Sequence, residues 1–389
     1  MPLTTPYTLV PTPPRRRALD ALATRLPRVG LDGVLADLDR AAEPCDVPGR
    51  AAGRGFTWAP EDRDDTSWTP QGLACLRSGD VVLVAWYARR RLGVATRGSR
   101  LTVVDRRDPE QPRYGHVLLT TPRRLPGAPT LGRVGVHAGG IAVVGDLLYV
   151  ADTLGGVRVF RLADVVAVPR RRLDAALPWR GAGTRTLGRR LTGGYTALGH
   201  DHVLPELMRL RAGVRAGLRR LRWSFLSVGE LDGRPCLVAG EYGRKGSTPR
   251  LAVYALDPRT GLPAVDPDGR CRPVEVHEDQ PPRMQGAAVA GSTWYLTAST
   301  GEGNPGDLHV GTPGHLRRHR GVLPTGPEDV DWARPGEELW CQTEWPGRRW
   351  VFPIDVRRWP GPPGADEADG GADAAGAGHA HPAGSAGGG

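Results

Sequence analysis

A short pattern of apolar runs recurs along the middle of the chain. Five runs rich in β-branched and aromatic residues end in small or acidic residues: DVVLVAWY (80–87), DLLYVADT (146–153), RPCLVAGEY (234–242), STWYLTAST (292–300) and EELWCQTEW (337–345). A segment rich in small residues precedes each run, and a further β-type run follows each. Gly-Asp or Asp-Gly pairs at 79–80, 145–146 and 232–233 are typical of hairpins. The pattern predicts a repeat array of antiparallel strands.

Fourth strands are visible after some copies, at 113–122 and 271–278. Each unit is therefore predicted to be a four-stranded sheet of the kind that packs radially as a propeller blade. We expect an all-β, five-bladed propeller, with six blades as the alternative if an insertion hides a degenerate copy. The last copy ends at its third strand, so a strand from the N-terminal side, FTWAP (56–60), is expected to close the ring.

Three segments depart from the repeat. Region 1–55 has leucine and alanine at helical spacing in RALDALATRL and LDGVLADLDRAAE, which predicts a helical and extended segment. The propeller is assigned to 56–360, with an insertion at 163–222 whose last piece, LPELMRLRAGVRAGLRRL, has the spacing of an amphipathic helix. Residues 361–389 contain almost no bulky apolar side chain and are expected to be disordered.

The charge of the chain changes this picture less than its size suggests. The net charge is +10 and the pI is about 9.9, yet Lys245 is the only lysine among 52 basic residues. Such an arginine bias is typical of GC-rich codon usage, so it disfavours nucleic acid as the partner. No apolar run reaches the roughly 18 residues of a membrane-spanning helix, and no signal peptide is evident, which leaves a cytoplasmic location open. We expect a monomer.

The five cysteines are widely separated and form no CxxC pair, which disfavours zinc. Cys75, Cys236 and Cys341 lie in strand-like runs and are expected to be buried. Cys45 and Cys271 lie in loop-like sequence and are the pair to test for a disulfide.

Candidate chemistry gathers where the first strands of the repeat begin and the second strands end, a face that we call the mouth. The residues expected to bind a ligand there are Gln71, Trp86, His137, Gln285, Glu328 and Asp329. No cofactor is required by the sequence, but the oxygen ligands of Asp152, Glu241 and Glu344 would suit Ca²⁺ or Mg²⁺ in the central channel. The alternative is that these polar groups hydrogen-bond the backbones of neighbouring blades. Because side chains alternate along a strand, we expect Glu328 rather than Asp329 to face the axis.

The segments WTPQGLA, VHAGGIAVVGDLLYVADTLGGVRVF, MQGAA and GVLPTGPEDVDW…ELWCQTEWPGRRWVF resemble a family of uncharacterised proteins of GC-rich bacteria that are commonly described as secreted. The resemblance spans about residues 65–356 and implies an extracellular location, without an established activity. There is a looser likeness to propeller lactonases and hydrolases that hold Ca²⁺ in the central channel. The sequence therefore favours a binding or scaffold protein that takes a small molecule, peptide or protein at the mouth. A metal-assisted hydrolase or lactonase that uses the same residues is the alternative.

Overall fold

The computed structural model describes residues 5–89, 97–125, 128–169, 186–190, 194–231, 233–243, 249–334 and 337–362. Within these ranges the protein consists mainly of strands, so the all-β prediction is confirmed. None of the helices in these ranges is long and apolar enough to cross a membrane. The predicted disordered tail beyond Pro362 lies outside the described residues.

The first two units of the repeat share one sheet. The first unit is an antiparallel meander of β5 (Trp68–Leu76), β6 (Val81–Ala88), β7 (Ser99–Asp105) and β8 (Arg113–Leu125). The second contains β10 (Ile141–Val144), β11 (Leu147–Asp152), β12 (Gly156–Arg161) and β16 (His202–Val214). Parallel pairing of β8 with β16 joins the two units into a 12-stranded sheet. Its remaining strands are β1 (Tyr7–Pro11), β2 (Arg40–Ala41), β9 (Ala128–Arg133) and β13 (Val166–Ala167).

The later units form separate sheets. One contains β17 (Phe225–Leu231), β18 (Arg234–Gly240), β19 (Leu251–Ala255) and β20 (Glu275–His277), and the next contains β21 (Met284–Ala290), β22 (Thr293–Ala298), β23 (Pro305–Thr312) and β24 (His315–Thr325). The last contains β25 (Pro327–Arg334), β26 (Glu338–Thr343), β27 (Trp350–Asp355), β4 (Gly55–Thr57) and β3 (Glu43–Cys45). The antiparallel pairing of β27 with β4 confirms that the FTWAP segment completes the last sheet.

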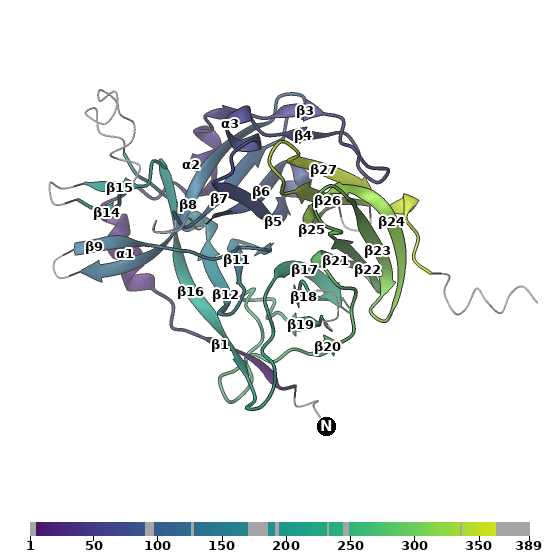
Figure 1. Ribbon diagram of the computed structural model, residues 1–389. Coiled ribbons are helices and arrows are strands. Elements are labelled where there is room, and N and C mark those ends of the chain that lie inside the picture. Colours follow the sequence, from purple (N-terminus) through teal and green to yellow (C-terminus); the bar gives the residue numbers. More distant parts are fainter. Residues whose placement is uncertain are drawn as a thin grey trace, which may run out of the picture.

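The first strands of the units, β5, β10, β17, β21 and β25, are called the inner strands below. Each lies against the next in this order, and β25 lies against β5, so the inner strands form a closed circuit. The sheets extend outward from this circuit (Figure 1). This is the radial arrangement of a β-propeller. The remaining elements are α1 (Arg16–Ala23), α2 (Gly30–Ala36), α3 (Pro60–Arg63) and a hairpin of β14 (Leu187–Arg189) with β15 (Tyr195–Ala197).

The predicted helix in the 163–222 insertion is wrong. Residues 202–214 form strand β16, and none of the described residues between 163 and 222 belongs to an α-helix. The strand pairs with β12 and β8, and its residues 202–208 are all buried. A strand that is covered on both faces needs apolar residues at odd and even positions, so leucines three residues apart fit it as well as they fit a helix.

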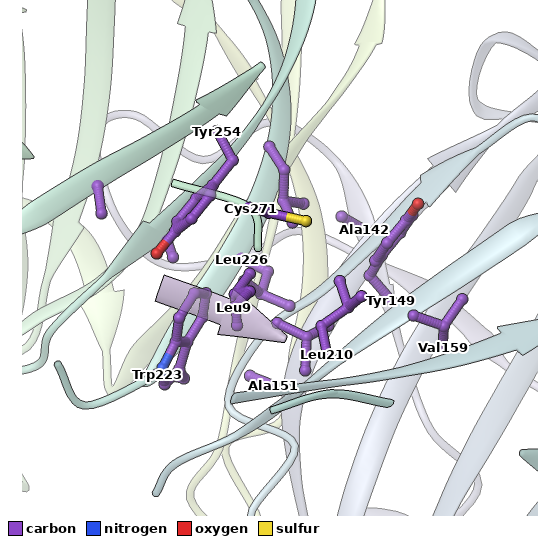
Figure 2. Close-up of a cluster of buried hydrophobic side chains, with 14 of the residues drawn as sticks. Leu9, Ala142, Tyr149, Ala151, Val159, Leu210, Trp223, Leu226, Tyr254 and Cys271 are labelled. Carbon is purple, nitrogen blue, oxygen red and sulfur yellow. The ribbon is translucent and has the colours of Figure 1, made fainter. Parts of the chain in front are cut away.

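Apolar clusters fill the spaces between neighbouring sheets. Figure 2 shows the cluster between the second unit and the third, where Leu9 of β1, Leu210 of β16, Trp223, Tyr254 and Cys271 meet. Each large apolar side chain that is buried in this way contributes about 1.5–3 kcal/mol to stability. Strand β1 thus ties the N-terminus to the propeller.

The cysteines are all free. Cys236 and Cys341 are buried as expected, whereas Cys75 is half-buried. Cys271 belongs to the cluster of Figure 2, while Cys45 packs against a different cluster around the last two sheets. The structure therefore gives no support to a bond between Cys45 and Cys271.

Glycine lets the inner strands approach one another backbone to backbone. A Cβ atom added at Gly140 would lie 2.1 Å from the Leu226 backbone nitrogen, and one at Gly72 would lie 2.7 Å from that of Ile141. The Gly72 N–H also donates to the Ala138 carbonyl over 3.1 Å. No larger residue fits at these positions without moving an inner strand.

Replacing Gly140 by alanine is expected to lower the free energy of unfolding by about 1–3 kcal/mol, because the new methyl group overlaps a backbone rather than a side chain that can move. Gly145→Asn is the control, since Gly145 has a left-handed backbone that asparagine tolerates and open space around it. Urea unfolding measures both. Equal stability of Gly140→Ala and the parent would contradict the close approach.

Candidate functional site

Four polar side chains from three different sheets form a continuous chain of hydrogen bonds at the mouth. Gln285 of β21 donates from Nε2 to Oε1 of Glu328 over 2.7 Å, and Gln71 of β5 donates to Oε2 of Glu344 over 3.2 Å. The carboxyl groups of Glu328 and Glu344 are hydrogen-bonded to each other. We call Gln71, Gln285, Glu328 and Glu344 the carboxyl cluster.

Two carboxyl groups in contact cannot both be ionised without strong repulsion. Burial raises the pKa of Glu328 well above its usual range, and the neighbouring charge of Glu344 raises it further. Burial also raises the pKa of Glu344, but the hydrogen bond from Glu328 and the positive charge of Arg89 oppose that rise. Glu328 therefore holds the shared proton, and Glu344 is the ionised partner.

Three more exposed residues, Tyr87, His137 and Arg89, lie beside the carboxyl cluster, and we call them the rim. Glu328 and Gln71 are buried, Tyr87 at the end of β6 is half-buried, and His137 and Arg89 are exposed. The rings of Tyr87 and His137 lie with their centroids 4.4 Å apart. Exposure therefore increases from Glu328 and Gln71 toward the rim.

Asp329 has a different place from Glu328, as the alternation of side chains predicts. Its Oδ2 atom accepts the backbone N–H groups of Leu73, over 3.0 Å, and Ile141, over 3.2 Å. Two residues further along β25, Asp331 accepts the N–H group of Cys75 over 2.8 Å. Asp329 thus bonds the backbones of neighbouring units and does not join the carboxyl cluster.

Trp86 also does not reach the mouth. It is fully buried, with the guanidinium groups of Arg100 and Arg349 stacked 4.8 and 5.3 Å from its ring. The neighbouring residue Tyr87 points to the mouth instead, because successive side chains of β6 face opposite sides of the sheet. A shift of one residue along β6 therefore separates a core side chain from one at the mouth. Arg89 lies beyond the run 80–87, so the sequence pattern did not single it out.

Asp152 and Glu241 lie apart from the carboxyl cluster, in ion pairs. Asp152 accepts from Arg158 over 2.9 Å, and buried Glu241 accepts from Arg250 over 2.7 Å and from the backbone N–H of Arg222 over 2.9 Å. Across the described ranges, no group of three or more histidine, cysteine, aspartate or glutamate side chains is placed to hold a metal ion.

Glu328 differs from most of the other buried acids because it has no arginine partner among the described residues. Five other buried acids have a guanidinium partner within 2.9 Å: Asp62 with Arg100, Asp164 with Arg161, Glu206 with Arg158, Glu241 with Arg250, and Asp307 with Arg318. Buried Asp329 accepts backbone N–H groups instead. Within the part of the chain that the structure describes, Glu328 makes no ion pair and is 1% exposed. Arginine neutralises a carboxylate directly, whereas Glu328 is neutral because it keeps its proton.

Comparisons with known proteins give distant likenesses only. No protein family model matches the chain, and no curated protein matches it. Among solved structures, CoXyl43, a GH43 β-xylosidase/α-arabinofuranosidase from a compost microbial metagenome, is 12% identical, with 81% of this chain and 94% of that chain covered and a TM-score of 0.37. The β-propeller domain of Cps50 (Swd1) from Myceliophteria thermophila is 16% identical, with 73% and 83% covered and a TM-score of 0.34. These values are too low for any conclusion about function.

The raised pKa of Glu328 makes stability depend on pH. A carboxyl group whose pKa rises on folding favours the native state below its unfolded pKa of about 4.5, and this contribution is lost as the pH rises toward the folded value. Glu328→Gln keeps the shape of the side chain and stays neutral. The variant is therefore expected to match the parent at acidic pH and to become more stable than the parent as the pH rises, by at most about 1.4 kcal/mol per pH unit.

Urea unfolding across this pH range, with exposed Glu278→Gln as the control, measures the difference. A constant loss of stability in Glu328→Gln at every pH would mean that Glu328 is an ionised structural group, and would contradict the proton assignment.

Proposed function

We propose that this protein is a β-propeller binding protein whose ligand site is the carboxyl cluster with its rim. The observation that carries the proposal is the hydrogen bond between Glu328 and Glu344, in which buried Glu328 makes no ion pair with any described residue. Keeping buried Glu328 beside the half-buried carboxyl group of Glu344 lowers stability, and in a chain with 52 basic residues an arginine would be the simpler solution. Such a cost is expected at functional sites more than in structural cores.

The chemistry of the site favours an uncharged ligand that carries hydroxyl groups, such as a saccharide. The charge of Glu344 is opposed by Arg89, so the site offers no net charge to a ligand. Ionised Glu344 accepts hydrogen bonds from hydroxyl groups, and the amide oxygens of Gln71 and Gln285 are further acceptors. The ring of Tyr87 supplies an apolar face beside these polar groups.

We also propose that the fold has five blades. The circuit of inner strands supports this count, because each inner strand begins one antiparallel unit and the unit that starts with β25 is completed by β4. The 163–222 insertion contributes β13, β14, β15 and part of the second unit within the described residues, which does not amount to a sixth sheet of four strands.

A hydrolase is the second candidate, because protonated Glu328 beside ionised Glu344 provides an acid and a base. The two carboxyl groups are hydrogen-bonded to each other, however, whereas those of retaining glycosidases are about 5–5.5 Å apart and those of inverting enzymes about 6.5–9.5 Å. The pair instead resembles two carboxyl groups that share one proton. Metal-assisted chemistry would need Ca²⁺ or Mg²⁺ bound by Glu344 with the amide oxygens of Gln71 and Gln285.

Saturation-transfer NMR with a panel of neutral mono- and disaccharides tests the binding proposal. Glu344→Gln is expected to weaken binding about tenfold, because it removes one charge-assisted hydrogen bond. Tyr87→Ala is also expected to weaken binding, since the apolar face is lost. Tyr87→Phe keeps the ring and is expected to bind as the parent does. If the parent bound none of these saccharides, or if Glu344→Gln bound them equally well, the proposed ligand class would be wrong.

A chelator separates binding from metal-assisted hydrolysis. Under our proposal, EDTA leaves the melting temperature of the purified protein unchanged, and added Ca²⁺ or Mg²⁺ does not raise it. A metal that binds only the native state must raise the melting temperature. If Ca²⁺ or Mg²⁺ did so in the parent but not in Glu344→Gln, the metal-assisted hydrolase would replace the binding protein as the better explanation.

A further inference from the structure

A hollow of about 340 Å³ lies beside strands β12 and β16, and arginine dominates its wall. Arg158 comes from β12, Arg209 and Arg211 from β16, and Arg220 from the segment that follows β16. Asp152 is the acidic residue of the lining. The volume lies in the lower part of the range for small-molecule sites.

A buried carboxylate holds two of these arginines in ion pairs. Glu206 is fully buried and accepts hydrogen bonds from Arg158 over 2.6 Å, Arg209 over 2.9 Å and Arg15 over 3.2 Å. Asp152 accepts from Arg158 over 2.9 Å. The guanidinium groups of Arg158 and Arg209 are therefore held in place before any ligand arrives, so little conformational entropy is lost on binding.

The other two arginines have no counter-charge. Arg211 and Arg220 are exposed, and within the described ranges their guanidinium groups make no hydrogen bond or ion pair. Arg158 and Arg209 are paired with Asp152 and Glu206, and Arg15 also shares Glu206. At least two positive charges of the lining, those of Arg211 and Arg220, are therefore left without a counter-charge among the described residues. Arginine cannot become neutral by losing its proton, so this positive charge persists and attracts an anion.

We propose that this hollow binds a phosphate monoester through Arg211 and Arg220, beside Arg158 and Arg209. A phosphate monoester carries nearly two negative charges at neutral pH, which matches the uncompensated charge. The planar guanidinium fork suits phosphate oxygens because it can donate two hydrogen bonds in parallel. Leu154, which lines the hollow and is 60% exposed, offers an apolar surface for the organic part of the ester.

The size of the hollow distinguishes this ligand from a long polyanion. A second, wider hollow of about 670 Å³ is lined by Arg15, Arg16, Arg17 and Arg123, near the start of α1. A nucleic acid that spans both hollows would contact Arg16 and Arg17, whereas a small phosphate monoester needs only the first hollow. Variants in the two hollows therefore separate the two classes of ligand.

Calorimetric titration of the full chain with phenyl phosphate and with inorganic phosphate, at low and high salt, tests the proposal. We expect both probes to bind at low salt and phenyl phosphate to bind more tightly, because its ring contacts Leu154. Arg211→Gln with Arg220→Gln is expected to weaken binding about tenfold for each arginine removed. Arg16→Gln with Arg17→Gln, and exposed Arg317→Gln on β24, are expected to bind as the parent does.

Three results would overturn this inference. The first is no binding of either phosphate probe at low salt. The second is equal affinity of the Arg211→Gln, Arg220→Gln variant and the parent, which would place the bound phosphate elsewhere. The third is binding of duplex DNA or phosphatidic acid vesicles, reduced by Arg16→Gln with Arg17→Gln, without binding of phenyl phosphate, because that would indicate an extended polyanion or lipid surface. Normal melting of each variant ensures that a loss of binding is not a loss of fold.

Discussion

The fold depends on how the backbone N–H groups at the central edge of each inner strand find hydrogen-bond partners. An inner strand has a hydrogen-bonded neighbour within its own unit on one side only, and each buried N–H group left without a partner costs about 1–3 kcal/mol. Strand β25 solves this for β5 with side chains: Asp329 accepts from Leu73, and Asp331 accepts from Cys75. Asp329 and Asp331 are two positions apart on β25, and so are Leu73 and Cys75 on β5. The side chains on one face of β25 therefore have the same spacing as the N–H groups on the free edge of β5. Through Ile141, Asp329 also bonds the second unit, so two carboxyl groups connect the last unit of the chain with the first two.

The same alternation that directs Asp329 to the backbone directs Glu328 to the mouth. The β25 segment therefore combines a structural acid and a site acid in adjacent positions. The burial that the central contacts require raises the pKa of Asp331 to about 7 and that of Asp329 well above its usual range. Glu328 is buried by the same packing, which explains why it holds a proton and why Glu344 is left as the ionised group of the pair.

The sequence predicted those features that depend on local pattern, and missed those that depend on distant contacts. Repeated apolar runs and turn pairs identified the inner strands and the closing strand β4. The register of a strand with its neighbours decides which of its side chains face the mouth, and a local pattern does not give this register. The sequence therefore placed Trp86 at the mouth, where the structure has Tyr87. The apolar spacing of β16 was ambiguous because both its faces are covered. The arginine partners of Asp152 and Glu241 come from neighbouring strands or from the far end of a loop, and no short-range pattern pairs a particular acid with a particular arginine.

Among the described residues, the carboxyl group of Glu328 and the guanidinium groups of Arg211 and Arg220 make no ion pair, and the two kinds of group differ in whether they can become neutral. A buried carboxyl group without a charged partner can take a proton, as Glu328 does, and it then needs no ligand to balance a charge. A guanidinium group cannot lose its charge in this way, because its pKa lies above the pH range in which proteins are stable. Arg211 and Arg220 are therefore balanced only by salt ions or by a bound anion. The carboxyl cluster is suited to a neutral ligand and the arginine-lined hollow to an anionic one, and this difference follows from acid–base chemistry rather than from the fold.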